Sequence, residues 1–187
     1  MSVLKTVLAF LAVALSLSVF GQGYVPASNG TAITFSIKNF GINVEGAMNE
    51  IAGQITFDPT NLTKSIFDVT LQTSSLNTGI DLRDSHLKKE EYFDVENYPS
   101  IRFISSTIVK LSDSGYRVTG LLKIKETEKE VIFPFTVQKS TKNDDTVIVF
   151  SGSFAINRRD FGVGGRSFSM ADEVQIDLKV NTMPSGS

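Results

Sequence analysis

Residues 116–137 read YRVTGLLKIKETEKEVIFPFTV, a pair of runs in which apolar and polar side chains alternate. The apolar side chains of these two runs are Tyr116, Val118, Leu122 and Ile124, followed by Val131, Phe133, Phe135 and Val137. Successive side chains of a β-strand point to opposite faces, so the alternation predicts two strands that each bury one face. Such one-sided burial is typical of antiparallel sheets.

The same period-2 alternation recurs through most of the remaining chain. Its apolar positions are Ile33, Phe35 and Ile37; Ile55 and Phe57; Phe67, Val69 and Leu71; Ile101 and Phe103; Ile148, Phe150, Phe154 and Ile156; and Val174, Ile176, Leu178 and Val180. Turn-forming residues separate the runs at Asp58-Pro59, Asp113-Ser114-Gly115 and Lys142-Asn143-Asp144-Asp145. About eight short antiparallel strands predict an all-β domain, folded either as a closed barrel or as a sandwich.

Residues 80–94, IDLRDSHLKKEEYFD, break the alternation. They contain no Gly, no Pro and no β-branched run, and Asp84 and Lys88 stand four residues apart in the favourable order for a helical ion pair. This segment predicts one or two short helices that end before Pro99.

A hydrophobic run, Val7–Phe20, follows a single positive charge at Lys5. The run is too short to span a bilayer comfortably. It ends at Val19-Phe20-Gly21, a pattern typical of a signal peptidase site. We therefore expect residues 1–21 to be a signal peptide and residues 22–187 to form a single domain. The mature protein is then expected to be soluble and either periplasmic or secreted.

The composition excludes several kinds of site. The chain has no Cys, which excludes disulfides, thiolate catalysis, Cys-based metal sites and a lipid anchor on an N-terminal Cys. One His excludes a multi-His metal site within one subunit. The formal net charge is −2 and Lys and Arg do not cluster, so the sequence lacks the basic footprint of a nucleic-acid-binding protein. No metal or cofactor is expected.

The chain has 14 Phe and no Trp, which leaves two interpretations of the barrel interior. The aromatic rings could fill the core, or they could wall a pocket for an apolar ligand. An eight-stranded barrel can do either. On these observations alone, a filled core is favoured.

Arg83, Asp84 and His86 place a cation, a carboxylate and an imidazole within four residues. They could form an acid/base or anion site, or they could be structural, with a buried ion pair and a hydrogen-bonded His tying the helix to the barrel. Ser85 cannot be activated by His86, because adjacent side chains on a helix point apart. The structural role is favoured.

Residues 156–166, INRRDFGVGGR, leave a strand and enter a Gly-rich loop. Three arginines near exposed backbone amides could hold a phosphate. The alternative, which the residues favour, is a wide turn in which one Arg pairs with Asp160. The segment has neither a Walker A nor a dinucleotide-binding pattern.

Together these segments resemble the YceI-like family of secreted bacterial proteins. The matching stretches are Gly53-x-Ile55-x-Phe57-Asp58, Ser75-Leu76-x-Thr78-Gly79, Arg83-Asp84-x-His86-Leu87, Tyr92-Phe93-Asp94-Val95-x-x-Tyr98-Pro99-x-Ile101-x-Phe103-x-Ser105-Ser106 and Asn157-Arg158-x-Asp160-Phe161-Gly162. The resemblance implies an extended, lipocalin-like antiparallel barrel of eight strands, covered by the short helices of residues 80–94. One departure is Asn39, which stands where the family often has His.

Several members of the family hold a polyisoprenoid or a similar long-chain amphiphile in the barrel, and the family is not known for catalysis. The resemblance therefore implies a carrier of a long-chain isoprenoid or fatty amphiphile that is not an enzyme and does not insert stably into membranes. Candidate side chains around the apolar tail are Phe35, Ile37, Phe57, Val69, Leu71, Leu87, Phe103, Val118, Leu122, Phe133, Phe135 and Phe154. The candidates for a charged head group are Arg83, Arg158 and Arg166.

The alternative function is that of a filled β-domain that acts as an envelope stress or interaction protein without a physiological ligand. The two functions differ in what the barrel contains. A continuous apolar cavity of several hundred Å³ favours the carrier, whereas voids no larger than a water molecule favour the alternative. The sequence leaves the oligomeric state open, and a homodimer is one arrangement compatible with it.

Overall fold

The computed structural model describes residues 22–142 and 145–185, and the expected signal peptide and the tip of the turn at Asn143-Asp144 lie outside them. The ten strands are β1 (Gln22–Pro26), β2 (Ala32–Asn39), β3 (Ile42–Met48), β4 (Ile51–Phe57), β5 (Ile66–Gln72), β6 (Ser100–Lys110), β7 (Gly115–Ile124), β8 (Thr127–Lys142), β9 (Asp145–Asn157) and β10 (Met170–Pro184). The one α-helix of the described residues is α1 (Asp81–Leu87), and the 3₁₀ turns are η1 (Leu62–Lys64), η2 (Thr73–Ser75) and η3 (Arg158–Phe161).

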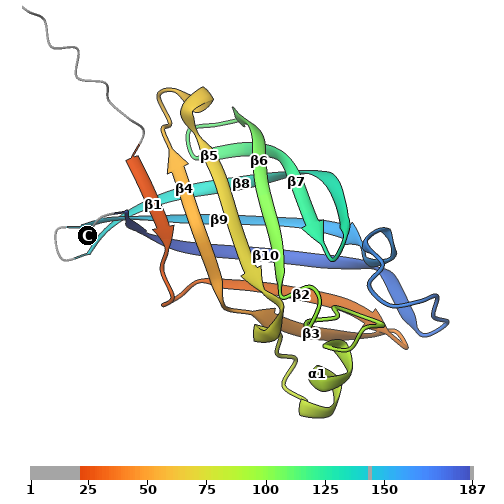
Figure 1. Cartoon of the computed structure of the whole chain (residues 1–187). Helices are drawn as coiled ribbons and strands as arrows, with labels where there is room; N and C mark the ends of the chain where they lie inside the picture. Colours follow the sequence, from red (N-terminus) through yellow and green to blue (C-terminus); the bar gives the residue numbers. More distant parts are fainter. Residues whose placement is uncertain (1–21, 143–144, 186–187) are drawn as a thin grey trace, which may run out of the picture.

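All the strands pair antiparallel in one sheet, in the order β1-β4-β5-β6-β7-β8-β9-β10-β2-β3 (Figure 1). A further pairing between β1 and β10, which brings Val25 opposite Met183, joins the two sides and closes β1 and β4–β10 into an eight-stranded barrel. The β2–β3 hairpin extends the sheet beside this ring, because β2 pairs with the first part of β10. The predicted all-β barrel is confirmed, and the sandwich alternative is excluded.

The helical segment is shorter than predicted. α1 covers residues 81–87, and residues 88–97 continue as a series of turns. Phe93 N–H donates to the carbonyl of Leu87 and Asp94 has a positive φ, so the chain folds back on the end of the helix. This segment lies below the barrel in Figure 1, at one of its ends.

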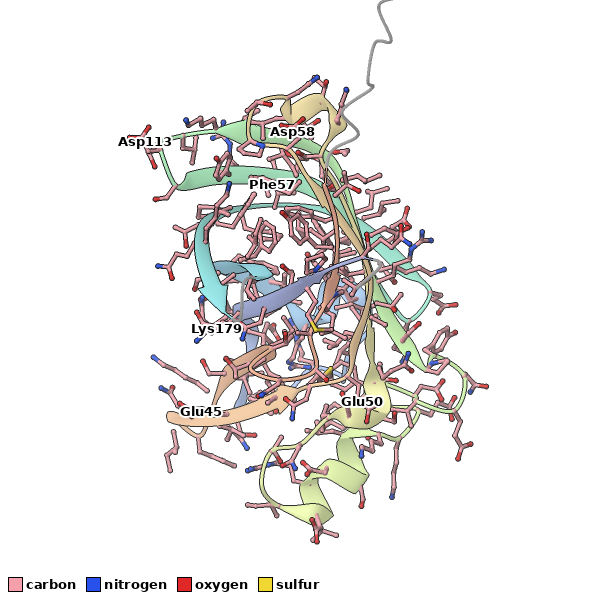
Figure 2. The ribbon with its side chains drawn as sticks, turned by 90° about the vertical axis from the view of Figure 1, so that its left-hand side faces the viewer. Glu45, Glu50, Phe57, Asp58, Asp113 and Lys179 are labelled. Carbon is pink, nitrogen blue, oxygen red and sulfur yellow. The ribbon has the colours of Figure 1, made fainter. Side chains whose placement is uncertain are left out.

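The two ends of the barrel are built differently. The turns that join β4 to β5 and β6 to β7 lie at one end, which carries Asp58 and Asp113 at the top of Figure 2. The connections of residues 73–99, 125–126 and 158–169 lie at the other end, together with α1. We call these the plugged end and the open end.

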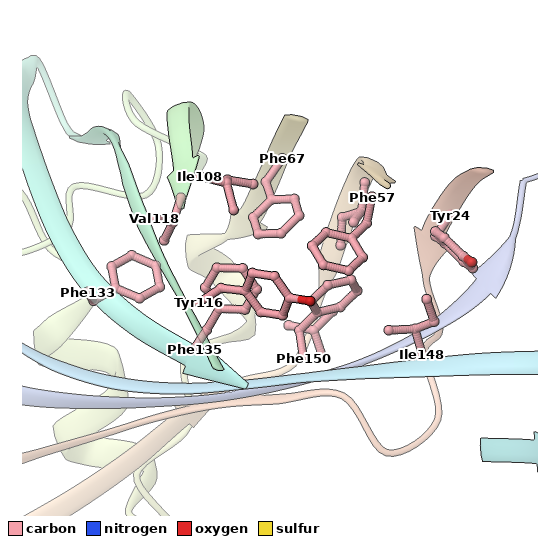
Figure 3. Close-up of a cluster of buried hydrophobic side chains, with 12 residues drawn as sticks. Tyr24, Phe57, Phe67, Ile108, Tyr116, Val118, Phe133, Phe135, Ile148 and Phe150 are labelled. Atoms are coloured by element: carbon pink, nitrogen blue, oxygen red, sulfur yellow. The ribbon is translucent and has the colours of Figure 1, made fainter. Parts of the chain in front are cut away.

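Aromatic side chains fill the plugged end and form what we call the aromatic plug (Figure 3): Phe57, Phe67, Tyr116, Phe135 and Phe150. The rings of Phe57 and Tyr116 meet edge to face at 5.2 Å between centroids, and those of Phe67 and Phe150 do so at 5.3 Å. Edge-to-face contacts add to the stabilisation that burial alone provides. Four of the 14 Phe therefore form packed core at this end, as the filled-core interpretation expects for it.

Candidate functional site: an apolar cavity at the open end

A cavity of about 280 Å³ lies between the aromatic plug and the open end. A single water molecule needs only about 10–15 Å³ measured in the same way, so this space is no packing defect. The rings of Phe67, Phe135 and Phe150 form its floor, and side chains of most strands form its walls. The barrel is thus packed at one end and hollow at the other.

Most of the side chains predicted to surround an apolar tail line this cavity. These are Phe35, Ile37, Val69, Leu71, Leu87, Phe103, Leu122, Phe133, Phe135 and Phe154. Phe133 and Phe154 stack with centroids 4.3 Å apart and planes within 10°. Phe57 and Val118 do not line the cavity: Phe57 belongs to the aromatic plug, and Val118 is 0% exposed in the same buried cluster. Alternation distinguishes inside from outside, but it does not give the depth of a residue along the barrel.

Several lining residues were missed by the sequence analysis. Val44 and Asn39 come from the β2–β3 hairpin, Tyr92 follows α1, and Val163 and Met170 flank the Gly-rich loop. Only Val44 lies within a strand interior, and its strand, β3, was not predicted. The Oδ1 atom of Asn39 is buried and accepts no hydrogen bond from any described residue, so a polar acceptor without a partner lies at the cavity wall.

Arg83 is half-buried and lines the cavity. Its Nε donates to Thr78 Oγ1 at 2.7 Å and its Nη2 to the Thr78 carbonyl at 2.8 Å. It forms no ion pair with any residue between 22 and 142 or 145 and 185. Its Nη1 hydrogens are therefore not used by these bonds, and the Asp84 carboxylate is linked to it only through the Thr78 hydroxyl.

The expected anchoring of α1 by a buried ion pair is wrong. The buried carboxylate of Asp84 instead accepts hydrogen bonds from the backbone N–H and the hydroxyl of Thr78. The cationic side chain of Arg83 and the anionic side chain of Asp84 thus both form hydrogen bonds with Thr78. The helix begins against the loop that precedes it, which fixes where Arg83 sits at the cavity.

The expected hydrogen-bonded His is also corrected. The His86 side chain is 58% exposed, with its Nε2 atom 3.8 Å from Glu91 Oε2, a distance too long for a hydrogen bond. Its ring meets that of Tyr92 edge to face at 5.1 Å. His86 belongs to the outer surface of the segment and does not line the cavity.

Arg158 is the buried anchor of the Gly-rich loop, with 4% of its surface exposed. Its Nε donates to the Ala171 carbonyl, its Nη1 to the carbonyls of Val163 and Gly165, and its Nη2 to Asp172 Oδ1 at 2.9 Å. Although Arg158 lines the cavity, these bonds engage all three of its nitrogens and its charge is paired.

The other charges of this loop also differ from expectation. Asp160 pairs with Lys129 at 3.4 Å rather than with an Arg of its own loop, and Arg159 joins Arg158 on Asp172. Asp160 cannot reach back to Arg158 because η3 turns the two side chains in different directions: Arg158 is buried and Asp160 is exposed. Arg166 is exposed and lies outside the cavity lining.

The turn between β7 and β8 closes against the segment after α1. Lys125 Nζ donates to the Glu90 carbonyl at 3.0 Å and lies 5.9 Å from the centre of the Tyr98 ring. The negative charge of Glu126 raises the pKa of the Tyr98 phenol above its ordinary value. These contacts hold one side of the open end in place.

Known proteins resemble this chain over nearly its whole length. A YceI-like domain matches residues 24–182. A UPF0312 protein of Pseudomonas aeruginosa is 30% identical over 190 residues, which cover 95% of this chain and 97% of that protein. The crystal structure of Burkholderia cenocepacia BcnA has a TM-score of 0.77 and 27% identity, covering 83% of this chain and 98% of that one.

A third similar structure is a polyisoprenoid-binding domain from Saccharophagus degradans, with a TM-score of 0.70. The alignment covers 87% of this chain and 99% of that domain, at 13% identity, which establishes a common fold alone. The YceI-like match spans the barrel from β1 to β10 and includes the residues that surround the cavity. The chain therefore belongs to the YceI-like family.

Proposed function

We propose that the protein is a carrier that holds a long-chain isoprenoid or fatty amphiphile in the barrel cavity. The observation that carries this proposal is a continuous apolar cavity of about 280 Å³, open at one end of an otherwise packed barrel. The fold shared with a polyisoprenoid-binding domain supports the choice of ligand class. Apolar pockets with a few placed polar groups are the usual form of small-molecule sites.

Shape and head group decide which ligand occupies such a cavity. Transfer from water stabilises an apolar chain by about 0.8 kcal/mol for each CH₂ group, but a lipid starts from a membrane, where this term nearly cancels. Arg83 is our candidate to bind the head group of the ligand, because it lines the cavity, its Nη1 hydrogens are unused and it forms no direct ion pair with a described residue. Arg158 is assigned to the loop instead, because its bonds are already made.

We propose binding rather than catalysis as the role of the cavity. Its polar lining consists of Asn39, Thr70, Thr78, Arg83 and Arg158, with the phenol of Tyr92. Among these described residues there is no carboxylate, imidazole or amine to serve as a base for a hydroxyl nucleophile. Measured turnover of any ester or diphosphate by the purified protein would contradict this assignment.

We further propose that the carrier works outside the cytoplasm after residues 1–21 are removed. The apolar run behind Lys5 and its small residue at Gly21 motivate this. Across residues 22–142 and 145–185, no helix is long and apolar enough to cross a membrane. Intact mass of protein recovered from the host's periplasm or medium should correspond to a chain that begins at Gln22. A mass that includes Met1 would refute the proposal.

Filling the cavity tests the carrier directly. Val174 lines it without belonging to either packed cluster, so Val174→Trp should occupy free space. It should keep the melting temperature of the lipid-extracted parent and lower the uptake of a fluorescent long-chain probe. Leu121→Trp, on the outer face of β7, is the matched control and should take up the probe normally.

The alternative of a filled domain without a ligand predicts a different pair of results. A barrel with no space would be overpacked by Val174→Trp and lose about 1–3 kcal/mol of stability. A destabilised Val174→Trp together with no probe uptake by the parent protein would establish that alternative and end the carrier proposal.

A further inference from the structure

Two chain segments lie side by side at the rim of the cavity. The tip of the β2–β3 hairpin is tied to the β9–β10 loop by a hydrogen bond from Phe40 N–H to the Ser169 carbonyl at 2.8 Å. Asn39 pairs with Met170 just behind them, and both of these residues line the cavity. In Figure 1 the tip of the β2–β3 hairpin and the β9–β10 loop lie at the same end of the sheet.

Large apolar side chains project from these tips into solvent. Phe40 is 82% exposed, Ile42 is 71% exposed and Phe168 is fully exposed. With Lys38 and Arg166, which are also exposed, they form what we call the rim patch. Contiguous exposed apolar residues on a folded protein mark an interaction surface more often than isolated ones do.

The backbone at Phe40 strengthens this argument. Asn39 pairs with Ile42, so Phe40 and Gly41 form a two-residue hairpin loop, with φ of +50° and +77°. Such a loop needs positive φ at both positions and favours Asn-Gly. A bulky Phe at positive φ is a backbone outlier, and here its side chain packs on little of the protein. Neither the conformation of the turn nor packing in the core accounts for a Phe at position 40. A residue that breaks a local rule in this way is expected where it contacts something outside the chain.

The charges of the rim patch indicate the chemistry of that contact. Residues 38–42 and 164–169 contain Lys38 and Arg166 and no acidic residue. Neither cation forms an ion pair within the described chain. Aromatic side chains beside basic ones suit the boundary between lipid head groups and acyl chains, and basic residues are attracted to anionic lipids.

We infer that the rim patch docks the open end of the barrel onto an anionic lipid bilayer. This inference rests on the proposed carrier function, because the docked mouth would let a long chain pass between bilayer and cavity without crossing water. Phe40 and Phe168 insert at the head-group boundary, Lys38 and Arg166 meet the lipid charges, and the contact is peripheral and reversible.

Vesicle co-sedimentation tests the inference with full-length mature protein stripped of bound lipid. The parent should bind vesicles of mixed phosphatidylcholine and phosphatidylglycerol, and added salt or phosphatidylcholine alone should weaken the binding. Phe40→Asn combined with Phe168→Ser should reduce binding by about tenfold. Phe40→Asn alone should keep or raise the melting temperature, because Asn suits the turn. Unfolding at this turn would therefore not explain a loss of vesicle binding by the double variant.

Leu111→Ser is the matched control, since Leu111 is 55% exposed but lies at the plugged end, and it should bind vesicles like the parent. Unchanged binding by the double variant would overturn the inference. So would a parent that self-associates through this patch, seen as a concentration-dependent mass that the double variant abolishes. Probe uptake by the parent from a vesicle-free dispersion is measured separately. If the parent takes up no probe, the carrier function is contradicted. If the parent takes up the probe normally but does not bind vesicles, only the docking inference is contradicted.

Discussion

Arg158 illustrates how a single buried cation can organise a loop. It donates hydrogen bonds to three backbone carbonyl oxygens in and after the Gly-rich segment and to one carboxylate oxygen of Asp172. Gly162 and Gly164 adopt positive φ within this loop, and a Cβ at Gly164 would lie 2.9 Å from Arg158 Nη1. Gly164 therefore lets the backbone pass close to the guanidinium, and Gly162 supplies the left-handed turn that ends η3.

Replacing Arg158 by Lys should destabilise the protein, because an ammonium cannot match the planar fork or reach the same acceptors. We expect a loss of about 1–3 kcal/mol in the free energy of unfolding, together with faster hydrogen exchange over residues 162–170. Chemical denaturation and exchange mass spectrometry measure both. Arg159→Lys is the control: Arg159 is 42% exposed and bonds Asp172 at 3.2 Å, so it should change little. Equal stability of the two variants would remove Arg158 as the anchor.

Among the strands and helices, the sequence predicted those in which alternation is regular and missed those in which it is not. β1 reads QGYVP and contains both Gly and Pro, and β3 reads INVEGAM and contains Gly46. A tertiary contact explains why residue 46 is Gly: it faces Phe35, and a Cβ there would lie 2.3 Å from the Phe35 ring. Such a reason exists only once β2 and β3 are paired, so a local pattern cannot reveal it.

The same limit applied to the cavity. Alternation found many of its strand-borne walls but not Val44 of β3. Asn39 and Met170 lie where strands end, and Val163 lies in a loop. The roles of Arg83, Asp84 and His86 were also out of reach, because they depend on where the loop around Thr78 passes. Closure of the barrel depends on β1 pairing with β10, a contact between the two ends of the domain.

β5 and β6 are joined by a bidentate ion pair that should make their pairing pH-dependent. Arg102 donates to both carboxylate oxygens of Asp68 at 2.9 and 2.8 Å and lowers the pKa of Asp68 below its usual value. The stabilisation is complete above the ordinary Asp pKa and is lost as pH falls through the lowered one. Both side chains are partly exposed, so solvent screening keeps the effect small.

We therefore expect Arg102→Gln to melt slightly below the parent at neutral pH, with the difference shrinking in acid below the usual carboxyl range. Thermal melts across a pH series measure this. Arg117→Gln, an exposed position on β7 without an ion pair in the described chain, should run parallel to the parent at every pH. A difference for Arg102→Gln that persists in strong acid would contradict the role given to Asp68.

For the molecule as a whole, stability should depend on whether the cavity is occupied. A ligand that binds only the folded barrel stabilises it by mass action, by about 2.7 kcal/mol when free ligand is a hundred times its dissociation constant. Protein purified from its host should melt lower after lipid extraction and recover when the extract is returned. Val174→Trp serves as the control and should respond weakly to both steps. An unchanged melting temperature on extraction would mean that the cavity was not occupied.

The separation of aromatic plug and cavity has a consequence for how such proteins diverge. Folding draws on Phe57, Tyr116 and Ile148, which are buried and do not line the cavity, whereas a ligand would meet the wall residues towards the open end. Drift among the latter leaves the former intact, so the barrel survives while its preference changes. Under the proposed carrier function, the same scaffold can therefore accept a different ligand after changes to single side chains of the cavity wall.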